Sequence, residues 1–367
     1  MKIKDISLVD PKKSININKL DFINYLETSD VKDGEIINST FLKINYPSSA
    51  KKEIRENDIL LSKVRPYLKH NCIIKQPKNN FVASSAFIQI RVIEKIWNPK
   101  FIYYFLTCNK NINLYICNCS GTTYPTFDKK IVANLILPEV SHQKQEHIVN
   151  TIGSVDDLIK NLQLQIYKIC FILNKSLNLY SKFVQFSYYS PQIIKSGIKE
   201  FIGDKYYLDT SCVDGINNIN NWSIITYTNR QSRANMQPLE NTVWFAKMKD
   251  SIKKVIITKY DQDFINKYIL STGFLGIQAS NNLPLSFLSS IIISKDFDQQ
   301  KNSNCVGTTM SSINNETFLN INVPLLNKDE LSMYDKQYHQ YIHLLSLYRR
   351  KIDKLKFIKN KLLNKYF

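Results

Sequence analysis

The chain has 367 residues, of which 44% are hydrophobic and 22% charged, so it is long enough for two globular domains and is not a disordered tail. Its formal net charge of +18 favours a polyanionic partner, either nucleic acid or an acidic membrane surface, although the many Lys, Asn and Ile residues also fit the bias of an AT-rich genome. The first residues lack the apolar core of a signal peptide, no run approaches the roughly 18 apolar residues of a membrane span, and seven cysteines without a CxxC pair indicate reduced thiols. We therefore predict a soluble, cytoplasmic, basic protein without a membrane partner.

Short β-branched and aromatic runs alternate with turn residues along the first half of the chain. They predict strands at 58–64 (DILLSKV), 81–92 (FVASSAFIQIRV) and 131–138 (IVANLILP). A helix is predicted at 99–113, between the last two strands. This half is therefore expected to fold as a compact α+β domain of roughly 130–140 residues.

The second half of the chain repeats the first. The blocks NYLETSDV (24–31), YPSSA (46–50), VASSAF (82–87) and GTTYPTF (121–127) return in the same order as YYLDTSCV (206–213), RQSRA (230–234), ILSTGF (269–274) and GTTMSSI (307–313). Matched blocks, and the prolines Pro138 and Pro324 that follow them, are separated by 182 to 187 residues. Such a constant separation indicates a duplication with small insertions in loops. The second copy is predicted to have strands at 242–248, 271–278 and 318–324, and a shorter helical stretch at 283–290.

Each copy ends in a long segment with helical periodicity. After Pro138 and again after Pro324, apolar residues recur at alternating steps of three and four for about five heptads. This pattern predicts two helices that bury each other's seam in an antiparallel coiled coil; the alternative is an amphipathic helix that lies on its own domain. The predicted seam includes Ile152, Ile159, Ile166, Leu173, Tyr338, Leu345, Ile352 and Leu355.

Several of these blocks together resemble a known family. GTTYPTF, followed by an apolar run, Pro138 and the glutamine-bearing helix start HQKQEHI (142–148), is similar to the end of a target-recognition domain in the specificity subunit of Type I restriction–modification systems. NDILLSKVRPYLKH (57–70) with VASSAF resembles the mid-domain strands of that family, and SRANMQ (232–237) with ILSTGF resembles the same elements in the second copy. The resemblance covers essentially the whole chain.

The resemblance implies an α+β fold with pseudo-twofold symmetry, in which two target-recognition domains are separated by two long helices. The expected segments are a first target-recognition domain at 1–140, a spacer helix at 141–183, a second target-recognition domain at 184–326 and a second spacer helix at 327–367. It also implies a non-catalytic protein that binds a bipartite site in double-stranded DNA. Its expected partners are two methyltransferase subunits and restriction subunits, and S-adenosylmethionine, ATP and Mg²⁺ would belong to those partners. No cofactor is expected in this chain.

Candidate DNA-binding residues are cations and hydroxyls in the loops of both copies, because phosphate contacts give affinity and groove contacts give base choice. In the first copy they are Lys63, Arg65, Lys69, His70, Ser84, Ser85, Thr122, Thr123 and Tyr124. In the second copy they are Arg230, Arg233, Lys247, Lys249, Lys253, Lys254, Thr272, Thr308 and Thr309. For any single lysine, a solvated surface charge is the competing interpretation, whereas arginine can grip guanine or phosphate with two hydrogen bonds.

Motifs for catalysis are weak. The sequence has neither a GxxxxGK[ST] loop nor a GxGxxG turn, and the two D-x-K strings at 30–32 and 128–130 are expected by chance in a Lys-rich chain. His339 and His343 are spaced like a metal pair but lack a glutamate between them, so we predict no metal site. Two other functions stay open at this point: a single-chain DNA endonuclease with an unrecognised active site, and a coiled-coil assembly protein that binds DNA without sequence preference.

Overall fold

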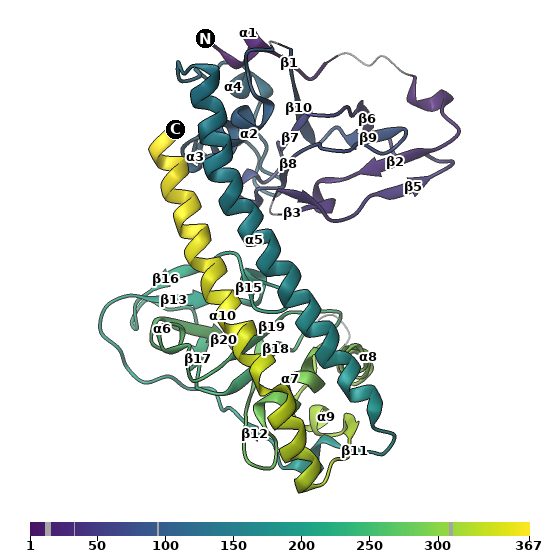
Figure 1. Ribbon diagram of the computed structural model, residues 1–367, viewed down its shortest axis with the longest axis vertical. Coiled ribbons are helices and arrows are strands. Elements are labelled where there is room, and N and C mark those ends of the chain that lie inside the picture. The colour runs from purple at the N-terminus through teal and green to yellow at the C-terminus, as the bar shows by residue number, and fades with distance from the viewer. Residues whose placement is uncertain (12–15, 33, 94, 308–310) are drawn as a thin grey trace. The chain divides into compact units, whose positions relative to one another are not determined.

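A computed structural model describes residues 1–11, 16–32, 34–93, 95–307 and 311–367. The chain divides into two compact units (Figure 1). Unit 1 comprises Met1–Leu158 with Leu355–Phe367, and unit 2 comprises Ile159–Lys354. Each unit includes part of both long helices, α5 (His142–Ser176) and α10 (Lys328–Tyr366). The four predicted segments give each long helix a segment of its own, whereas the division into compact units cuts through both helices. The bounds of the predicted segments therefore stay a prediction.

Unit 1 is built on two four-stranded sheets and a small hairpin. The first sheet is antiparallel, in the order β1 (Ser7–Val9), β10 (Phe87–Val92), β7 (Ile59–Ser62) and β8 (Asn71–Ile73). The second sheet has the order β5 (Thr40–Leu42), β2 (Ile23–Leu26), β9 (Phe81–Ser84) and β6 (Ala50–Glu53). Strands β2 and β9 run parallel, while β5 and β6 pair antiparallel with their neighbours. The hairpin is β3 (Val31–Lys32) with β4 (Glu35–Ile36), and the shortest helical elements are α1 (Ile3–Ile6), η1 (Ile17–Lys19), η2 (Thr28–Asp30) and η3 (Pro66–Leu68).

The single strand predicted at 81–92 is wrong, because the chain turns between β9 and β10 and enters the other sheet. The turn is closed locally: the Ala86 N–H donates to Ser84 Oγ at 3.2 Å. The run VASSAF is thus the passage between two sheets. A side-chain hydroxyl that satisfies a backbone donor within two residues favours such a turn over a continuous strand.

The helical region of unit 1 begins at a well-formed cap. Asn98 Oδ1 accepts from the Lys100 and Phe101 N–H groups, and Pro99 occupies the first helical position of α2 (Pro99–Thr107). Extended backbone at Cys108 then separates α2 from α3 (Asn109–Cys117), so the predicted helix at 99–113 is two helices. The strand predicted at 131–138 is also wrong at its start, where Asp128 caps the short helix α4 (Lys129–Ala133).

Unit 2 has the same strand orders. Its antiparallel sheet runs β12 (Gln192–Ile193), β21 (Phe274–Gln278), β18 (Thr242–Ala246) and β19 (Lys254–Ile257). Its other sheet runs β16 (Ser223–Ile225), β13 (Lys205–Leu208), β20 (Tyr268–Ser271) and β17 (Ala234–Met236), again with the two middle strands parallel. Corresponding strands follow one another in the same order along both halves of the chain, so the predicted duplication is confirmed at the level of topology.

Several further elements of unit 2 correspond to those of unit 1. They are the hairpin β14 (Val213–Asp214) with β15 (Asn218–Ile219), the helices α7 (Leu285–Ile293), α8 (Lys295–Ser303) and α9 (Asn315–Leu319), and the short turn η6 (Thr210–Cys212). Unit 2 also has the strand pair β11 (Phe183–Gln185) with β22 (Asn322–Pro324) and the short turns η4 (Leu177–Leu179) and η5 (Phe186–Tyr189). Helices α7 and α8 are as long as α2 and α3, which corrects the shorter counterpart expected at 283–290. Helix α6 (Gln262–Lys267) lies between β19 and β20, where unit 1 has no helix among its described residues.

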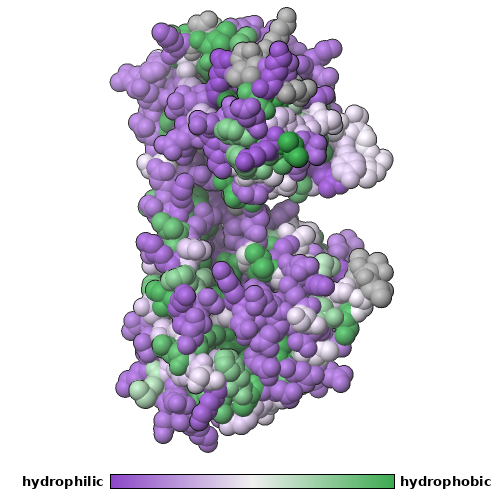
Figure 2. Space-filling view, turned by 90° about the vertical axis from the view of Figure 1, so that its right-hand side faces the viewer, coloured by the Kyte–Doolittle hydropathy of each residue, from purple (hydrophilic) through white to green (hydrophobic). Residues whose placement is uncertain are grey.

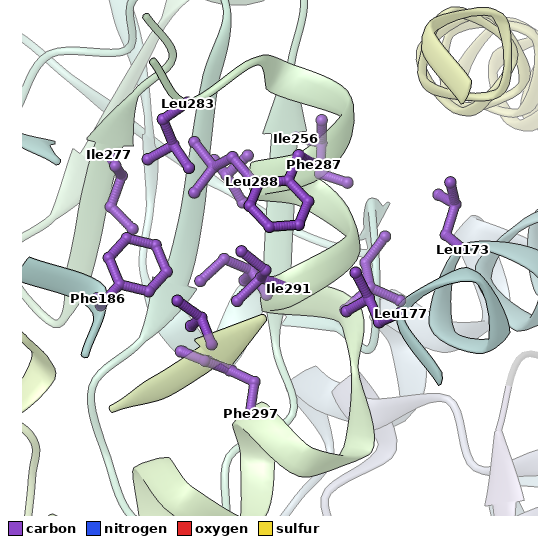
Figure 3. Packing of buried hydrophobic residues seen from close by; sticks show 14 of the residues in the cluster. Leu173, Leu177, Phe186, Ile256, Ile277, Leu283, Phe287, Leu288, Ile291 and Phe297 are labelled. Atoms are coloured by element: carbon purple, nitrogen blue, oxygen red, sulfur yellow. The ribbon is translucent and has the colours of Figure 1, made fainter. Parts of the chain in front are cut away.

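Each unit closes its core with the long helices. In unit 1, Ile148 and Ile152 of α5 join a cluster that also contains Phe101 of α2 and Leu363 of α10. In unit 2, Leu177, just beyond α5, packs with Phe287 and Ile291 of α7, as Figure 3 shows. None of the helices in the described ranges is both long and apolar enough to cross a membrane.

The predicted seam residues all lie out of solvent to some degree. Ile152, Leu173, Tyr338, Leu345 and Ile352 are buried, and Ile159, Ile166 and Leu355 are half-buried. In unit 2 the Ser176 hydroxyl, at the end of α5, hydrogen-bonds the Tyr334 hydroxyl near the start of α10. In unit 1 the Asp156 carboxylate of α5 pairs with Lys359, near the end of α10, at 2.6 Å.

Helix α10 has a second buried face. Ile342, Ser346 and Arg349 lie off the predicted seam and are almost fully buried in unit 2. Arg349 pairs there with Asp261, which follows β19, at 2.6 Å. The alternative interpretation of the periodicity, a helix lying on its own domain, therefore also describes α10.

Candidate nucleic-acid interface

Two predicted DNA-binding segments of unit 1 form one surface. Val64, just after β7, pairs with Thr126 in an isolated antiparallel bridge. On either side of it, the Phe127 N–H donates to Lys63 O at 3.2 Å and the Arg65 N–H donates to Pro125 O at 2.9 Å. The loop after β7 and the Gly-Thr-Thr-Tyr loop are therefore hydrogen-bonded side by side, although more than fifty residues separate them in the sequence.

The turn between β9 and β10 adjoins the same surface. The Lys63 N–H donates to Ala86 O at 3.0 Å, and the Ser85 N–H donates to Ser49 O at 2.7 Å. We name this the basic surface of unit 1 and define it by Lys63, Arg65, Ser49, Ser85 and the exposed residues Thr122, Thr123 and Tyr124.

Three further predicted residues of unit 1 lie in the loop after β7 or in the turn between β9 and β10. Lys69 is exposed, has left-handed backbone at φ 53°, and donates through Nζ to Asn109 Oδ1 at 3.1 Å. His70 is half-buried. Ser84 is only 6% exposed and its hydroxyl accepts from the Ala86 N–H, so its role is to shape the turn, which corrects its assignment as a DNA contact.

Unit 2 carries an equivalent basic surface. The Lys247 N–H donates to Gly273 O and Lys247 O accepts from the Ile313 N–H, both at 2.9 Å, as Lys63 does in unit 1. The Lys249 N–H donates to Ser311 O at 2.9 Å, which is the position of Arg65. The Thr272 N–H donates to Arg233 O at 2.9 Å, as Ser85 does to Ser49. This surface is defined by Arg233, Lys247, Lys249 and Thr272; Thr308 and Thr309 lie outside the described residues.

Positive charge is concentrated at both surfaces. Burial and the neighbouring charge of Arg233 lower the pKa of Lys247. In unit 1, burial and the charges of Lys63 and Lys129 lower the pKa of Lys52, against the opposing effect of its ion pair with Asp10. Cations close enough to disfavour each other's charged form are stabilised by a polyanion. Lys52 and Lys129 were not predicted; the signal for Lys52 is its place beside the repeated block YPSSA.

Two predicted lysines of unit 2 are engaged within the protein. Lys254 is 2% exposed, its Nζ donates to Asp298 Oδ2 at 2.8 Å, and burial lowers its pKa. It is a core ion pair, so its assignment as a DNA contact is wrong. Lys253 is half-buried and its Nζ donates to Thr210 O at 2.9 Å. Arg230 is half-buried in the loop between β16 and β17, where its guanidinium lies over the Tyr227 ring.

The acidic residues of the D-x-K strings have structural roles. Asp128 caps α4 by accepting from the Lys130 N–H at 2.7 Å, and Asp30 accepts from the Glu27 N–H at 2.9 Å in the turn η2. His339 and His343 face each other with ring centroids 5.9 Å apart. Within the described ranges no three His, Cys, Asp or Glu side chains form a group that could hold a metal ion.

Figure 2 shows a face on which hydrophilic residues predominate in both units, with hydrophobic residues in scattered patches.

The first part of the chain is similar to known proteins. The family profile of the Type I restriction modification DNA specificity domain matches residues 1–168. The Type I restriction enzyme HindI specificity subunit of Haemophilus influenzae is 28% identical in an alignment of 167 residues that covers 43% of this chain and 36% of that relative. The match thus spans little more than a third of the relative's length.

Two solved structures of S subunits are also similar to this chain. An HsdS subunit from Thermoanaerobacter tengcongensis has 16% identity and a TM-score of 0.44, with 100% of this chain and 95% of that chain covered. An S subunit of a Type I restriction–modification system from M. genitalium has 14% identity and a TM-score of 0.49, with the same coverage. The match of residues 1–168 to the family profile agrees with the resemblance found in the sequence, so the first part of the chain is similar to a Type I restriction modification DNA specificity domain.

Proposed function

We propose that this chain is a DNA-binding specificity subunit that recognises a bipartite target and directs the catalytic subunits of a Type I restriction–modification complex to it. In this proposal the chain itself is non-catalytic. Each unit reads one half of the target, and the sequence between the halves is not read.

The observation that carries the proposal is the repeated basic surface. Lys63 and Lys247 occupy equivalent positions, fixed by the same pair of backbone hydrogen bonds, at the end of equivalent strands. Duplicated folds that keep a cation in the same place, while the surrounding loops differ in sequence, are suited to bind the same polyanion at two sites and to read a different sequence at each.

The long helices support a spaced target. A helix of 35 residues, the length of α5, extends over about 50 Å at 1.5 Å per residue. DNA half-sites on one face recur about every 34–36 Å. We propose that α5 and α10 pair as an antiparallel coiled coil that holds the two reading units about one to one and a half turns of DNA apart, with pseudo-twofold symmetry.

The proposed partners follow from the family. Two methyltransferase subunits suit a pseudo-twofold chain, and restriction subunits complete the enzyme. S-adenosylmethionine, ATP and Mg²⁺ would be bound by those subunits, in the cytoplasm.

Selection of duplexes from a random library by the purified full chain tests the proposal. We expect enrichment of two short motifs at a fixed separation. Enrichment of no motif, or of one uninterrupted motif, would contradict it. Incubation of the same chain with plasmid and Mg²⁺ is the companion assay: cleavage without any added subunit would establish an endonuclease instead.

A further inference from the structure

The seven arginines of the chain fall into two groups. Arg55, Arg91, Arg349 and Arg350 each lie within salt-bridge distance of a carboxylate. The other three are Arg65, Arg230 and Arg233, and for these the described part of the chain supplies no carboxylate within 4 Å. All three lie in loops, at or next to the basic surfaces, so their charges are available to a ligand.

Arg65 is held by its neighbours, although none of the described acidic side chains lies within 4 Å of it. Its Nη2 donates to Thr123 O at 3.0 Å, and its Cζ lies 4.9 Å from the centroid of the Tyr124 ring. Its own backbone is left-handed at φ 47°, and its N–H donates to Pro125 O. Tyr124 is 66% exposed. An aromatic side chain so exposed gains little from burial, and its contact with Arg65 adds to the hydrogen bond to Thr123 O in restraining the guanidinium.

Arg230 is held in the same way in unit 2. Its Nη1 donates to Tyr227 O at 2.5 Å, and its Cζ lies 4.2 Å from the centroid of the Tyr227 ring. Tyr227 is itself supported by Phe201, edge-on at 5.7 Å. In each unit, therefore, one arginine donates to a carbonyl and lies over a tyrosine ring, and within the described residues most of its other N–H donors have no protein acceptor.

We propose that Arg65 and Arg230 are the guanine-reading residues of the two units, and that Tyr124 and Tyr227 are positioning residues that hold each guanidinium in the plane of a base pair. This inference rests on the proposed function. A planar fork that is already oriented loses little side-chain freedom on binding and matches the paired O6 and N7 acceptors of guanine in the major groove. A phosphate accepts hydrogen bonds from many directions and gains less from a fixed plane.

The two reading arginines occupy different loops of the same fold. Arg65 follows β7, where unit 2 has Lys249, whereas Arg230 precedes β17, at the position of Tyr46 in unit 1. The units therefore present their reading groups from different loops of an equivalent fold. The guanine read by each unit should accordingly differ in its place within the half-site.

The experiment for unit 1 uses the full chain and duplexes of the selected motif with single base-pair substitutions. For Tyr124→Ala we expect about three- to tenfold less discrimination at one G·C pair in one half-site, with the other positions unchanged. Tyr124→Phe keeps the stack and should behave as the wild type. Arg65→Lys should lose the same discrimination, because an ammonium cannot bond both acceptors in a plane. Uniform weakening on every duplex with a shallower salt dependence would overturn the inference and place Arg65 on a phosphate.

For unit 2, Tyr227→Leu preserves an apolar side chain against Phe201 but removes the stacking face, with Tyr227→Phe as its control. We expect a similar loss at one G·C pair in the other half-site; a loss in the same half-site as Tyr124→Ala, or none, would overturn the inference. A wild-type chain that selects a bipartite motif while the tyrosine variants discriminate normally would refute this inference alone. A wild-type chain that selects no motif would refute the proposed function.

Discussion

Replacement of Arg349 by methionine should strongly destabilise unit 2. Arg349 lies on α10 and is 2% exposed, and its Nη2 is 2.6 Å from a carboxylate oxygen of Asp261, which is 1% exposed. Methionine preserves most of the apolar contacts but leaves the carboxylate without its main counter-charge. Loss of one partner of a buried ion pair costs about 3–5 kcal/mol of unfolding free energy.

The expected cost lies near the lower end, about 3 kcal/mol, because other donors to Asp261 remain. The Thr258 N–H and hydroxyl donate to Asp261 Oδ2 at 2.8 and 2.9 Å, and the Ser346 hydroxyl donates to Oδ1 at 2.7 Å. These hydrogen bonds solvate the charge in part after the arginine is removed.

The assay is urea unfolding followed by tryptophan fluorescence. Trp97 lies in unit 1, whereas Trp222 and Trp244 lie in unit 2, so a Trp97→Phe background reports on unit 2. The control is the double variant Asp261→Asn with Arg349→Met, in which no buried charge is left unpaired. It should recover most of the lost stability and fall within about 1 kcal/mol of the parent. A double variant as unstable as the single one would refute this account of the network.

Three further outcomes are expected. Burial alone would raise the pKa of Asp261, but the adjacent guanidinium and the hydrogen bonds lower it below 3.8. The contribution of Asp261 to stability should therefore be complete above about pH 4 and be lost as the pH falls through its lower folded-state pKa. Acid unfolding measured with and without Asp261→Asn checks this, and identical profiles would contradict it. Gly276→Ala would place a Cβ 2.5 Å from the Trp244 ring, so we expect a loss of about 1–3 kcal/mol in urea unfolding, whereas an unchanged midpoint would show that the ring can move. Lys247→Ala should reduce the salt dependence of duplex binding by about one phosphate contact, while Lys254→Ala should lower stability and leave that dependence unchanged; the reverse pattern would exchange their roles.

Much of the fold follows from the repeat in the sequence. Blocks such as YPSSA and RQSRA align Ala50 with Ala234, and both alanines begin the edge strand that pairs with the middle of its sheet. Because strand order depends on which apolar runs are buried, two copies with the same runs in the same order have the same topology.

The errors in prediction come from local side-chain chemistry. The run at 81–92 contains no Gly or Pro, so the turn at Ser84, which is closed by a hydroxyl, is not distinguishable from a strand by periodicity. At 131–138 the cap by Asp128 selects a helix for a β-branched run.

The candidate site was predictable only in part. Lys253 and Lys254 are neighbours and identical in type, but the carboxylate that holds Lys254 in the core is on Asp298, forty-four residues later. The stack of Arg65 on Tyr124 likewise joins two loops that are distant in sequence. Residue type indicates which groups can bind DNA, whereas long-range packing decides which of them face solvent.

The most direct test of the central claim is a map of adenine methylation in the source cells with and without this gene. Two units that read separate half-sites for partner methyltransferases predict a bipartite methylated motif with a fixed gap, present in the wild type and absent after deletion. Methylation that is unchanged by the deletion, or a lost motif that is continuous, would contradict the claim that this chain reads DNA through two separate units.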